Sequence, residues 1–436
     1  MSEELKTVLL WYRNDLRILD HQGLNQAMES GHRVVAYYTF NPRHYQTHPL
    51  GFKKTDKFRA QFNIESIEAL KASLKALNIS LIIEQKAPEE GLPRWIDELE
   101  VKAIHLQNEW TEEEKREETA VAQKIDPSVL WIRQYDQFLF HPDDLPFSPA
   151  QTPEVFGTFR KRCEKEVALR QLCLDPKPMP DENYIEVPHA LPCLSDLGLT
   201  ATDKDLRTAF PFTGGTKAGM ERLNYYFWDT KKLSHYKNTR NGMVGTDYSS
   251  KFSPWLANGC LSPKMIFWEI KRYEKEIQKN QSTYWLIFEL IWRDYFKFIS
   301  LKHANKIFKI GGILERDYSW KTEHGLFKKW TEGNTPEPFV NANMIELKAT
   351  GWMSNRGRQN VASYFAKELK MDWRIGAAYF ESLLIDYDVH SNYGNWMYVS
   401  GVGNDPRDRK FDVRWQAERY DTQGKFQNLW LQKTLF

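Results

Sequence analysis

The chain has 436 residues and a formal net charge of +2, with 41% hydrophobic and 14% aromatic residues. This length accommodates two or three domains with a large core, and the near-neutral charge excludes a uniformly basic nucleic-acid coat. None of the four cysteines forms a Cys-x-x-Cys pair, so no metal site is predicted. No apolar run reaches the roughly 18 residues that a membrane span needs, so we expect a cytoplasmic protein.

Short apolar runs alternate with helical patterns in the first third of the chain. The runs cover residues 7–12, 33–40, 79–84, 103–107 and 129–135, and a helical pattern covers 58–77. This alternation predicts a doubly wound parallel sheet. Arg13 to Arg17 follow the first run, where a dinucleotide-binding domain would carry Gly-x-Gly-x-x-Gly, so no phosphate-binding turn is expected there.

The composition changes twice after the sheet. Residues 137–206 are rich in proline and show little periodicity, which predicts a long connector. Beyond Gly214 and Gly215 nearly every segment has a helical pattern. The predicted organisation is therefore an α/β domain over 1–136, a connector over 137–206 and an all-helical domain over 207–436.

Residues 372–396 mix apolar helical positions with two carboxylates, carboxamides and tryptophans. We expect a core helix that ends near Asp386. Burying the ionised carboxylates of Asp386 and Asp388 costs several kcal/mol unless hydrogen-bond donors are present. A flavin nucleotide could supply such donors, and the alternative is a helix C-terminus with solvated carboxylates. This segment alone does not decide between them.

Residues 248–256 carry a second polar cluster. Ser253 suits an N-cap and Pro254 a first helical position, so a helix is predicted to start there. Free backbone N–H groups, the nearby serine hydroxyls and the cation of Lys251 would together suit a pyrophosphate. An ordinary capped helix is the alternative, since Ser262 and Pro263 repeat the same cap.

Residues 284–296 are apolar almost all round, which predicts a buried helix whose polar residues need a role. Glu289, Trp292 and Arg293 share one face at i, i+3 and i+4, where they could receive a planar ligand. A buried Glu289 to Arg293 salt bridge is the alternative.

Residues 351–359 carry amides and arginines that could reach phosphates, a flavin or base edges. The alternative is the start of a solvated helix.

Together with residues 9–17 and 236–245, these segments resemble the photolyase/cryptochrome family, and within it the cryptochrome DASH branch. The resemblance runs from Leu9 to about Arg407 and is densest after Gly214. It implies a helical domain that holds FAD folded into a U. The implied cofactor positions are Tyr236, Ser249, Ser250, Lys251, Phe252, Ser253, Glu289, Arg293, Arg358, Asp386, Tyr387, Asp388 and Asn392.

The resemblance further implies a deoxyribodipyrimidine photolyase, a carbon–carbon lyase. Light drives an electron from reduced FAD to a cyclobutane pyrimidine dimer, the ring splits and the electron returns. By the same resemblance, Asn392 would lie near flavin N5, and Asp386 would pair with Arg358. The implied dimer-pocket residues are Glu289, Trp292, Asn355 and Gln359, and the implied electron relay is Trp396, Trp373 and Trp320.

Two positions depart from duplex-specific photolyases. Gln359 stands where they typically carry methionine, and Tyr398 where they carry tryptophan. The more polar pocket favours dimers in single-stranded DNA, where no stable duplex has to be opened. Arg356, Tyr398 and Arg407 are predicted to contact DNA. Arg409, Lys410 and Arg414 could also follow its phosphates, and the alternative for residues 407–414 is a solvated charged tail.

Glu109 matches the family position that binds the antenna 5,10-methenyltetrahydrofolate; the alternative is the start of a helix near Thr111.

The predicted function is a blue-light-dependent photolyase for dimers in single-stranded DNA. A blue-light photoreceptor that signals through a protein partner and a duplex-DNA photolyase are the alternatives. We expect a monomer, and the sequence leaves RNA binding open.

Overall fold

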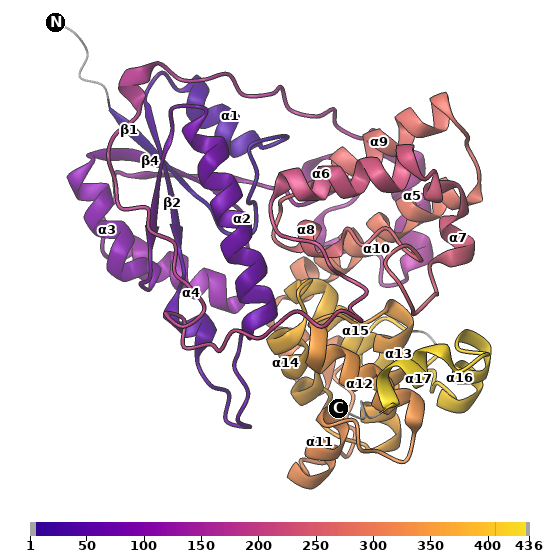
Figure 1. The fold of residues 1–436 in the computed structure, drawn as a ribbon. Helices are drawn as coiled ribbons and strands as arrows, with labels where there is room; N and C mark the ends of the chain where they lie inside the picture. Colours follow the sequence, from indigo (N-terminus) through magenta and orange to yellow (C-terminus); the bar gives the residue numbers. More distant parts are fainter. Residues whose placement is uncertain (1–5, 406, 433–436) are drawn as a thin grey trace, which may run out of the picture.

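The computed structural model describes residues 6–405 and 407–432. Its first part is a five-stranded parallel sheet flanked by helices, and its second part is helical (Figure 1). The elements of the first part are β1 (Thr7–Trp11), α1 (Gln22–Glu29), β2 (Arg33–Thr39), α2 (Lys57–Lys75), β3 (Ser80–Glu84), α3 (Pro88–Glu98), β4 (Val101–Gln107), α4 (Glu112–Ala122) and β5 (Leu130–Gln134).

The strand order is β3-β2-β1-β4-β5, with all neighbours parallel. This confirms the predicted doubly wound sheet, and the strand bounds differ from the predicted ones by two residues at most. β1 is buried at all five positions because it lies at the centre of the sheet. The strand order reverses on its two sides, so the crevice at the carboxyl ends of β1 and β4 is a natural ligand site.

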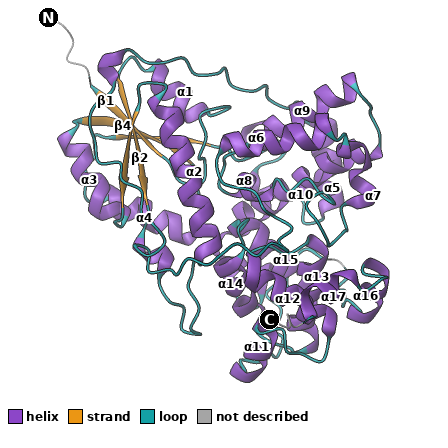
Figure 2. Ribbon diagram, viewed as in Figure 1, coloured by secondary structure: helices purple, strands orange, loops and turns teal. Residues whose placement is uncertain are grey.

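The second part is an array of helices, which confirms the helical prediction (Figure 2). Its α-helices are α5 (Phe156–Glu166), α6 (Thr216–Asn224), α7 (Tyr236–Thr239), α8 (Ser253–Ala257), α9 (Pro263–Glu276), α10 (Gln281–His303), α11 (His324–Thr331), α12 (Pro338–Thr350), α13 (Asn355–Ser363), α14 (Trp373–Leu383), α15 (Val389–Ser400), α16 (Val413–Tyr420) and α17 (Lys425–Leu431). Within the described residues, no helix is both long and apolar enough to cross a bilayer.

Helix α5 lies inside the segment where the sequence predicts little periodicity, and this part of the prediction is wrong. Phe156, Phe159 and Cys163 recur at i, i+3 and i+7 and are buried, and α5 packs against α10. This apolar face is hard to recognise because the flanking prolines and charged residues dominate the composition. Farther along, the connector follows the sheet domain: Asn183 Oδ1 accepts a hydrogen bond from the backbone N–H of Val34 at 2.8 Å.

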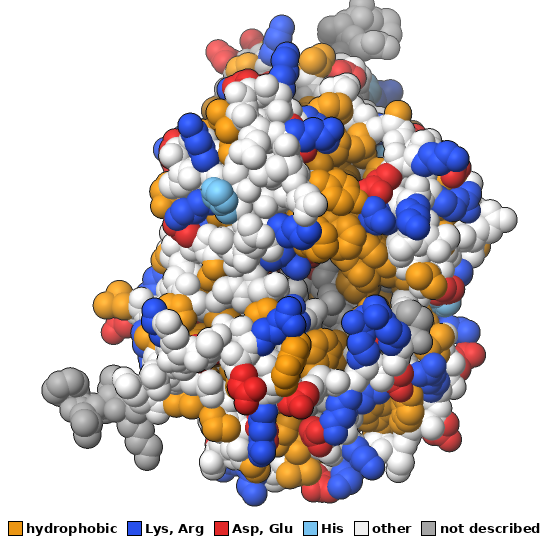
Figure 3. Space-filling view, turned by 90° about the vertical axis from the view of Figure 1, so that its right-hand side faces the viewer, with side chains coloured by type: hydrophobic (Ala, Val, Ile, Leu, Met, Phe, Trp, Pro, Cys, Tyr) orange, Lys and Arg blue, Asp and Glu red, His pale blue; other side chains and the backbone are white. Residues whose placement is uncertain are grey.

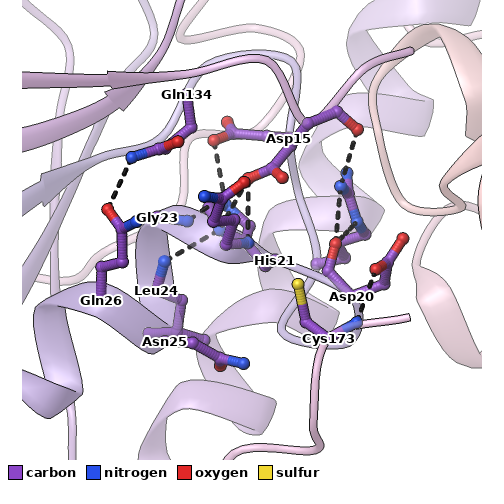
Figure 4. A network of polar contacts seen from close by, with 12 residues as sticks. Asp15, Asp20, His21, Gly23, Leu24, Asn25, Gln26, Gln134 and Cys173 are labelled. Atoms are coloured by element: carbon purple, nitrogen blue, oxygen red, sulfur yellow. Dashed lines mark hydrogen bonds and ion pairs between the residues drawn. The ribbon is translucent and has the colours of Figure 1, made fainter. Parts of the chain in front are cut away.

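A buried polar network follows β1 and ties the two parts together (Figure 4). His21 Nδ1 accepts a backbone N–H at the start of α1, so its Nε2 carries the proton that it donates to Asp15 at 3.0 Å. Asp20 accepts hydrogen bonds from the backbone N–H of Cys173 at 3.0 Å and from Lys264 Nζ at 2.8 Å. Because Lys264 belongs to α9, this carboxylate links the sheet domain, the connector and the helical part.

Candidate functional site

Two adjoining hollows lie among α7, α8, α10, α13 and α15, and we call them together the central cavity. The first chamber measures about 260 Å³ and the second about 100 Å³. They share five lining residues: Asn355, Arg358, Asp386, Asp388 and Ser391. The two chambers therefore adjoin at the turn between α14 and α15.

All thirteen predicted cofactor positions line this cavity. The first chamber holds Tyr236, Ser249, Ser250, Lys251, Phe252, Ser253, Glu289 and Arg293, besides the shared Arg358, Asp386 and Asp388. The second chamber adds Tyr387 and Asn392, together with Gln359 and Trp396. Residues from distant parts of the helical region thus line these two adjoining chambers.

The carboxylate of Asp386 is buried and has protein partners. Both of its oxygens accept hydrogen bonds from Arg358 Nη2, at 2.9 and 3.0 Å, and Oδ2 also accepts one from Ser253 Oγ at 2.6 Å. The pairing that the resemblance implies is therefore present, and the alternative of a solvated carboxylate is wrong for Asp386. The preceding helix, α14, ends at Leu383 rather than near Asp386.

The predicted helix start is present, since α8 begins at Ser253, but the predicted N-cap is wrong. The N-cap position is Phe252, whose side chain makes no hydrogen bond, and the Ser253 hydroxyl donates to Asp386 instead. With only five residues, α8 offers a weak dipole to a phosphate. The serine loop is instead shaped by Arg222, whose guanidinium donates to the carbonyls of Ser249 and Ser250 at 3.1 Å each.

Asp388 takes its partners from two neighbouring helices. Its Oδ2 accepts a hydrogen bond from Lys297 Nζ at 2.7 Å, and its Oδ1 caps α15 through the backbone N–H of Ser391 at 2.8 Å. Burial works to raise the pKa of this carboxyl, but the charges of Lys297 and Arg293 outweigh it, so the pKa is well below its usual range. Asp388 therefore lines the cavity as a carboxylate.

Lys251 provides a test of whether the cavity suits FAD. Its side chain is 2% exposed and lines the first chamber, and Nζ lies over the rings of Tyr248 and Trp352 without a hydrogen-bond partner among the described residues. Burial places its pKa well below the usual range. A phosphate group in the chamber would give this ammonium a partner and restore its charge, so the residues present fit a flavin dinucleotide.

Glu289 pairs with Arg240 at 2.7 Å. Arg293 donates instead to the backbone carbonyls of Gln137 and Leu256, at 2.6 and 2.9 Å, so the alternative Glu289 to Arg293 salt bridge is wrong. Burial raises the pKa of Glu289 above its usual value, and the charge of Arg240 opposes this rise. Arg240 was not among the predicted site residues, although it lies in the 236–245 segment that carries the resemblance.

Trp292 lines neither chamber of the cavity. The ring of Phe156, from the unpredicted helix α5, stacks on it with centroids 3.6 Å apart and planes 9° apart. Tyr398 contacts it edge-on, with a centroid distance of 6.0 Å. One face of the indole is therefore already covered by protein.

The three predicted relay tryptophans differ in their burial. Trp396 lines the second chamber and is 2% exposed, and its indole packs against Gly376 of α14. Trp373 begins the same helix and is fully buried, with Nε1 donating to the carbonyl of Ile310 at 2.9 Å. Trp320 is half-buried, and the bridge between its neighbour Lys321 and Met371 brings it beside α14.

A separate space of about 460 Å³, the interdomain cavity, opens at the carboxyl ends of β1 and β4. Glu109 lines it near the cations of Arg13 and Lys297 and accepts a hydrogen bond from Gln107 Nε2 at 2.8 Å. Burial raises the pKa of this carboxyl, and the cations oppose that rise. The expected helix also begins here, because α4 starts at Glu112 with Thr111 as its cap.

Three cations after Arg407 have carboxylate partners. Arg409 lies 3.5 Å from Asp405 and Arg414 lies 3.1 Å from Glu337, while Lys410 pairs with Glu368. These pairs favour the solvated tail for residues 409–414 over a continuous phosphate track. Arg407 is exposed, and Arg356 on α13 is held by amide oxygens alone within the described residues.

Comparisons with known proteins agree with this geometry. Residues 8–181 match the family model described as DNA photolyase, and residues 285–434 match the FAD binding domain of DNA photolyase. The chain is 47% identical to a cryptochrome DASH of Gloeobacter violaceus over 98% of this chain and 85% of the relative. It is 41% identical to the chloroplastic/mitochondrial cryptochrome DASH of Arabidopsis thaliana, over 98% and 75% of the two chains.

The crystal structure of a Synechocystis cryptochrome superposes with a TM-score of 0.94 at 44% identity, covering 99% of this chain and 89% of that one. A class III photolyase of Agrobacterium tumefaciens gives 0.84 at 25% identity, covering 99% and 87%. The chain therefore belongs to the photolyase/cryptochrome family, as an FAD-binding flavoprotein of its cryptochrome DASH branch.

Proposed function

We propose that this protein is a blue-light-dependent photolyase that splits cyclobutane pyrimidine dimers, preferentially in single-stranded DNA. The central cavity carries the proposal, because all predicted cofactor positions line it and Asn355 and Gln359 lie on the same walls. Bound FAD would supply, on excitation, the electron that splits the dimer. The residues around it would position the lesion and stabilise charge on it.

Glu289 has the geometry for this second task. Its side chain is half-buried beside Arg240, and the partial burial raises its pKa, which increases the share of the protonated form. A protonated carboxyl, or the Arg240 guanidinium next to it, can donate a hydrogen bond to a pyrimidine carbonyl as negative charge develops there. Trp292, stacked on Phe156, offers only its remaining face to a flipped base.

The single-strand preference is supported by the polar lining near Gln359. Its Oε1 accepts a hydrogen bond from Arg356 at 2.9 Å, and the ring of Tyr398 lies edge-on to Trp292 with centroids 6.0 Å apart. A dimer must be unpaired and unstacked before it can enter the pocket from a duplex, and a polar, amide-lined pocket offers little apolar contact to offset that cost. A dimer in a single strand is already unpaired, so less free energy is lost on binding. Lesions in single strands therefore suit this site better.

The decisive experiment is an absorbance spectrum of the purified protein, followed by blue-light repair of dimer-containing single-stranded and duplex oligonucleotides with reductant present. We expect flavin bands and faster repair of the single strand. Equal or faster duplex repair would refute the strand preference, and flavin without repair of either substrate would refute the photolyase function. Glu289→Gln should retain FAD and lower repair, whereas undiminished repair would remove Glu289 from the mechanism.

A blue-light photoreceptor is the second candidate, and the tryptophan series favours it. A relay that ends at the half-buried Trp320 would place an oxidised side chain where a partner protein can reach it. Trp396→Phe should slow photoreduction of bound flavin but leave repair by already reduced flavin unchanged. A variant that photoreduces at the wild-type rate would show that Trp396 is not part of the relay.

The interdomain cavity is proposed to hold 5,10-methenyltetrahydrofolate as an antenna. Glu109 would accept hydrogen bonds from the N–H groups of the pterin ring, and the surrounding cations would attract the folate carboxylates. Purified protein supplied with the folate should show an added near-ultraviolet band. Glu109→Gln should weaken that band without loss of FAD, and an unchanged band would refute the assignment.

A further inference from the structure

Four side chains form an alternating series of cations and aromatic rings, which we call the α16 ladder: Arg356, Tyr420, Arg419 and Trp415. The guanidinium of Arg356 lies 4.3 Å from the centroid of the Tyr420 ring. The guanidinium of Arg419 lies 5.6 Å from the same ring and 5.0 Å from that of Trp415. Three of the four belong to α16, and Arg356 comes from α13.

The positive charge of the ladder is not neutralised. Arg356 donates to the amide oxygens of Gln359, Gln416 and Asn241, at 2.9, 3.4 and 3.1 Å. No carboxylate among the described residues lies within 4.0 Å of Arg356 or Arg419. Burial lowers the pKa of Arg356, and the nearby cations Arg240 and Arg419 lower it further. The ladder therefore attracts anions.

The outer end of the ladder exposes a large aromatic surface. Trp415 is 48% exposed, which is unusual for tryptophan in the absence of a partner. Its backbone is held in place because Asp412 caps α16 and accepts the N–H of Trp415 at 3.0 Å. The indole is thus presented on the surface by a fixed helix.

The inner end of the ladder meets the wall of the central cavity. Arg356 joins Gln359, which lines the second chamber, to Gln416 of α16. The face of the molecule on the side of α7 and α16 has hydrophobic side chains gathered in a hollow, with Lys and Arg side chains around it (Figure 3). Since Trp415 and Tyr420 are five positions apart on α16, the ladder extends about 7.5 Å along the axis of this helix.

We propose that the α16 ladder is a binding site for the unpaired nucleotides that flank the lesion in single-stranded DNA, with one base stacked on Trp415 and a phosphate paired with Arg419. This inference rests on the proposed function. An aromatic face flanked by arginines is the arrangement that binds single strands without sequence preference. A duplex keeps its bases stacked on each other, so it could use only the cations, and the ladder would favour single strands.

The test compares Trp415→Ala, Trp415→Phe and Arg419→Gln with wild-type holoprotein, by fluorescence anisotropy on labelled oligonucleotides. The probes are a dimer without flanking nucleotides, the same dimer with about six nucleotides on either side, undamaged oligo(dT) and a duplex. Trp415→Ala should weaken binding of the flanked single strand and of oligo(dT) about five-fold or more. Binding of the unflanked dimer should not change, and Trp415→Phe should restore most of the affinity.

Arg419→Gln should lower the slope of log affinity against log salt by about 1 on the flanked strand. The matched control is Arg272→Gln on α9, since Arg272 also lies over an indole, that of Trp228 at 4.5 Å, but has Glu269 and Glu276 as partners. This control should leave DNA binding unchanged.

Wild-type affinity of Trp415→Ala for the flanked strand and for oligo(dT) would overturn the inference, even if the protein repairs dimers. An equal loss on flanked and unflanked dimers would also overturn it, because the ladder would then act through the dimer pocket. A wild-type protein that binds oligo(dT) through the ladder but repairs no dimer would instead refute the proposed function and leave the ladder as a single-strand site.

Discussion

Gly376→Ala tests how tightly Trp396 is held beside the central cavity. A Cβ built on Gly376 would lie 2.3 Å from Trp396 Cη2 and 2.8 and 2.9 Å from two further ring atoms. Ordinary van der Waals contact begins near 3.4 Å, so the indole or α14 must move by about 1 Å. The indole cannot swing away freely, because it packs against Phe380, Phe365 and Trp330, with centroid distances of 5.1, 6.0 and 6.3 Å.

Two effects of opposite sign determine how much Gly376→Ala changes the free energy of unfolding. Replacing glycine with alanine inside a helix stabilises the folded state by about 0.5–1 kcal/mol. Overpacking a dense core costs about 1–3 kcal/mol. We therefore expect a net loss of about 1–2 kcal/mol in the free energy of unfolding. The displaced indole should also slow photoreduction of bound flavin if Trp396 is the first member of the relay.

The assay combines urea unfolding with the rate of flavin photoreduction under blue light. Gly325→Ala in α11 is the matched control, because its Cβ would meet nothing within 4 Å. The control should be as stable as wild type or slightly more stable, with unchanged photoreduction. If Gly376→Ala matches the control in both measurements, the packing of Trp396 against α14 is not as close as the structure indicates.

Three further changes follow from buried contacts. Asp386→Asn leaves the Arg358 guanidinium without its carboxylate, so we expect the free energy of unfolding to fall by about 3–5 kcal/mol. FAD should also be retained less well, measured by flavin release on heating, and unchanged retention would contradict this. Glu346 is buried without a hydrogen-bond partner among the described residues, and burial raises its pKa to about 8. Its contribution to stability therefore falls as pH rises from about 4.5 to 8, and Glu346→Gln should flatten that decline by up to about 1.4 kcal/mol per pH unit in urea unfolding. An unchanged slope would contradict this prediction. Phe156→Ala removes the ring stacked on Trp292, so the free energy of unfolding in urea should fall by about 3 kcal/mol and the fluorescence of Trp292 should change. An unaltered spectrum would refute the stacking.

Local patterns determined the architecture. The five strands were predicted within two residues because the periodicity of buried positions is a property of short segments, and the parallel order follows from their alternation with helices. The pair formed by Asp386 and Arg358 was available from the family resemblance, because those positions match its motifs. The sequence also located the polar segments that line the central cavity.

The tertiary structure alone decided which groups meet. Glu289 and Arg293 have the i, i+4 spacing of a salt bridge, yet Arg293 donates to the carbonyls of two other segments and Glu289 pairs with Arg240, 49 positions away. Lys297 of α10 likewise pairs with Asp388, which lies at the start of a different helix, α15. Sequence spacing fixes distances only along one helix. A buried charge takes whichever partner the packing of helices brings within about 4 Å, because leaving it unpaired costs more than losing a neighbour on its own helix.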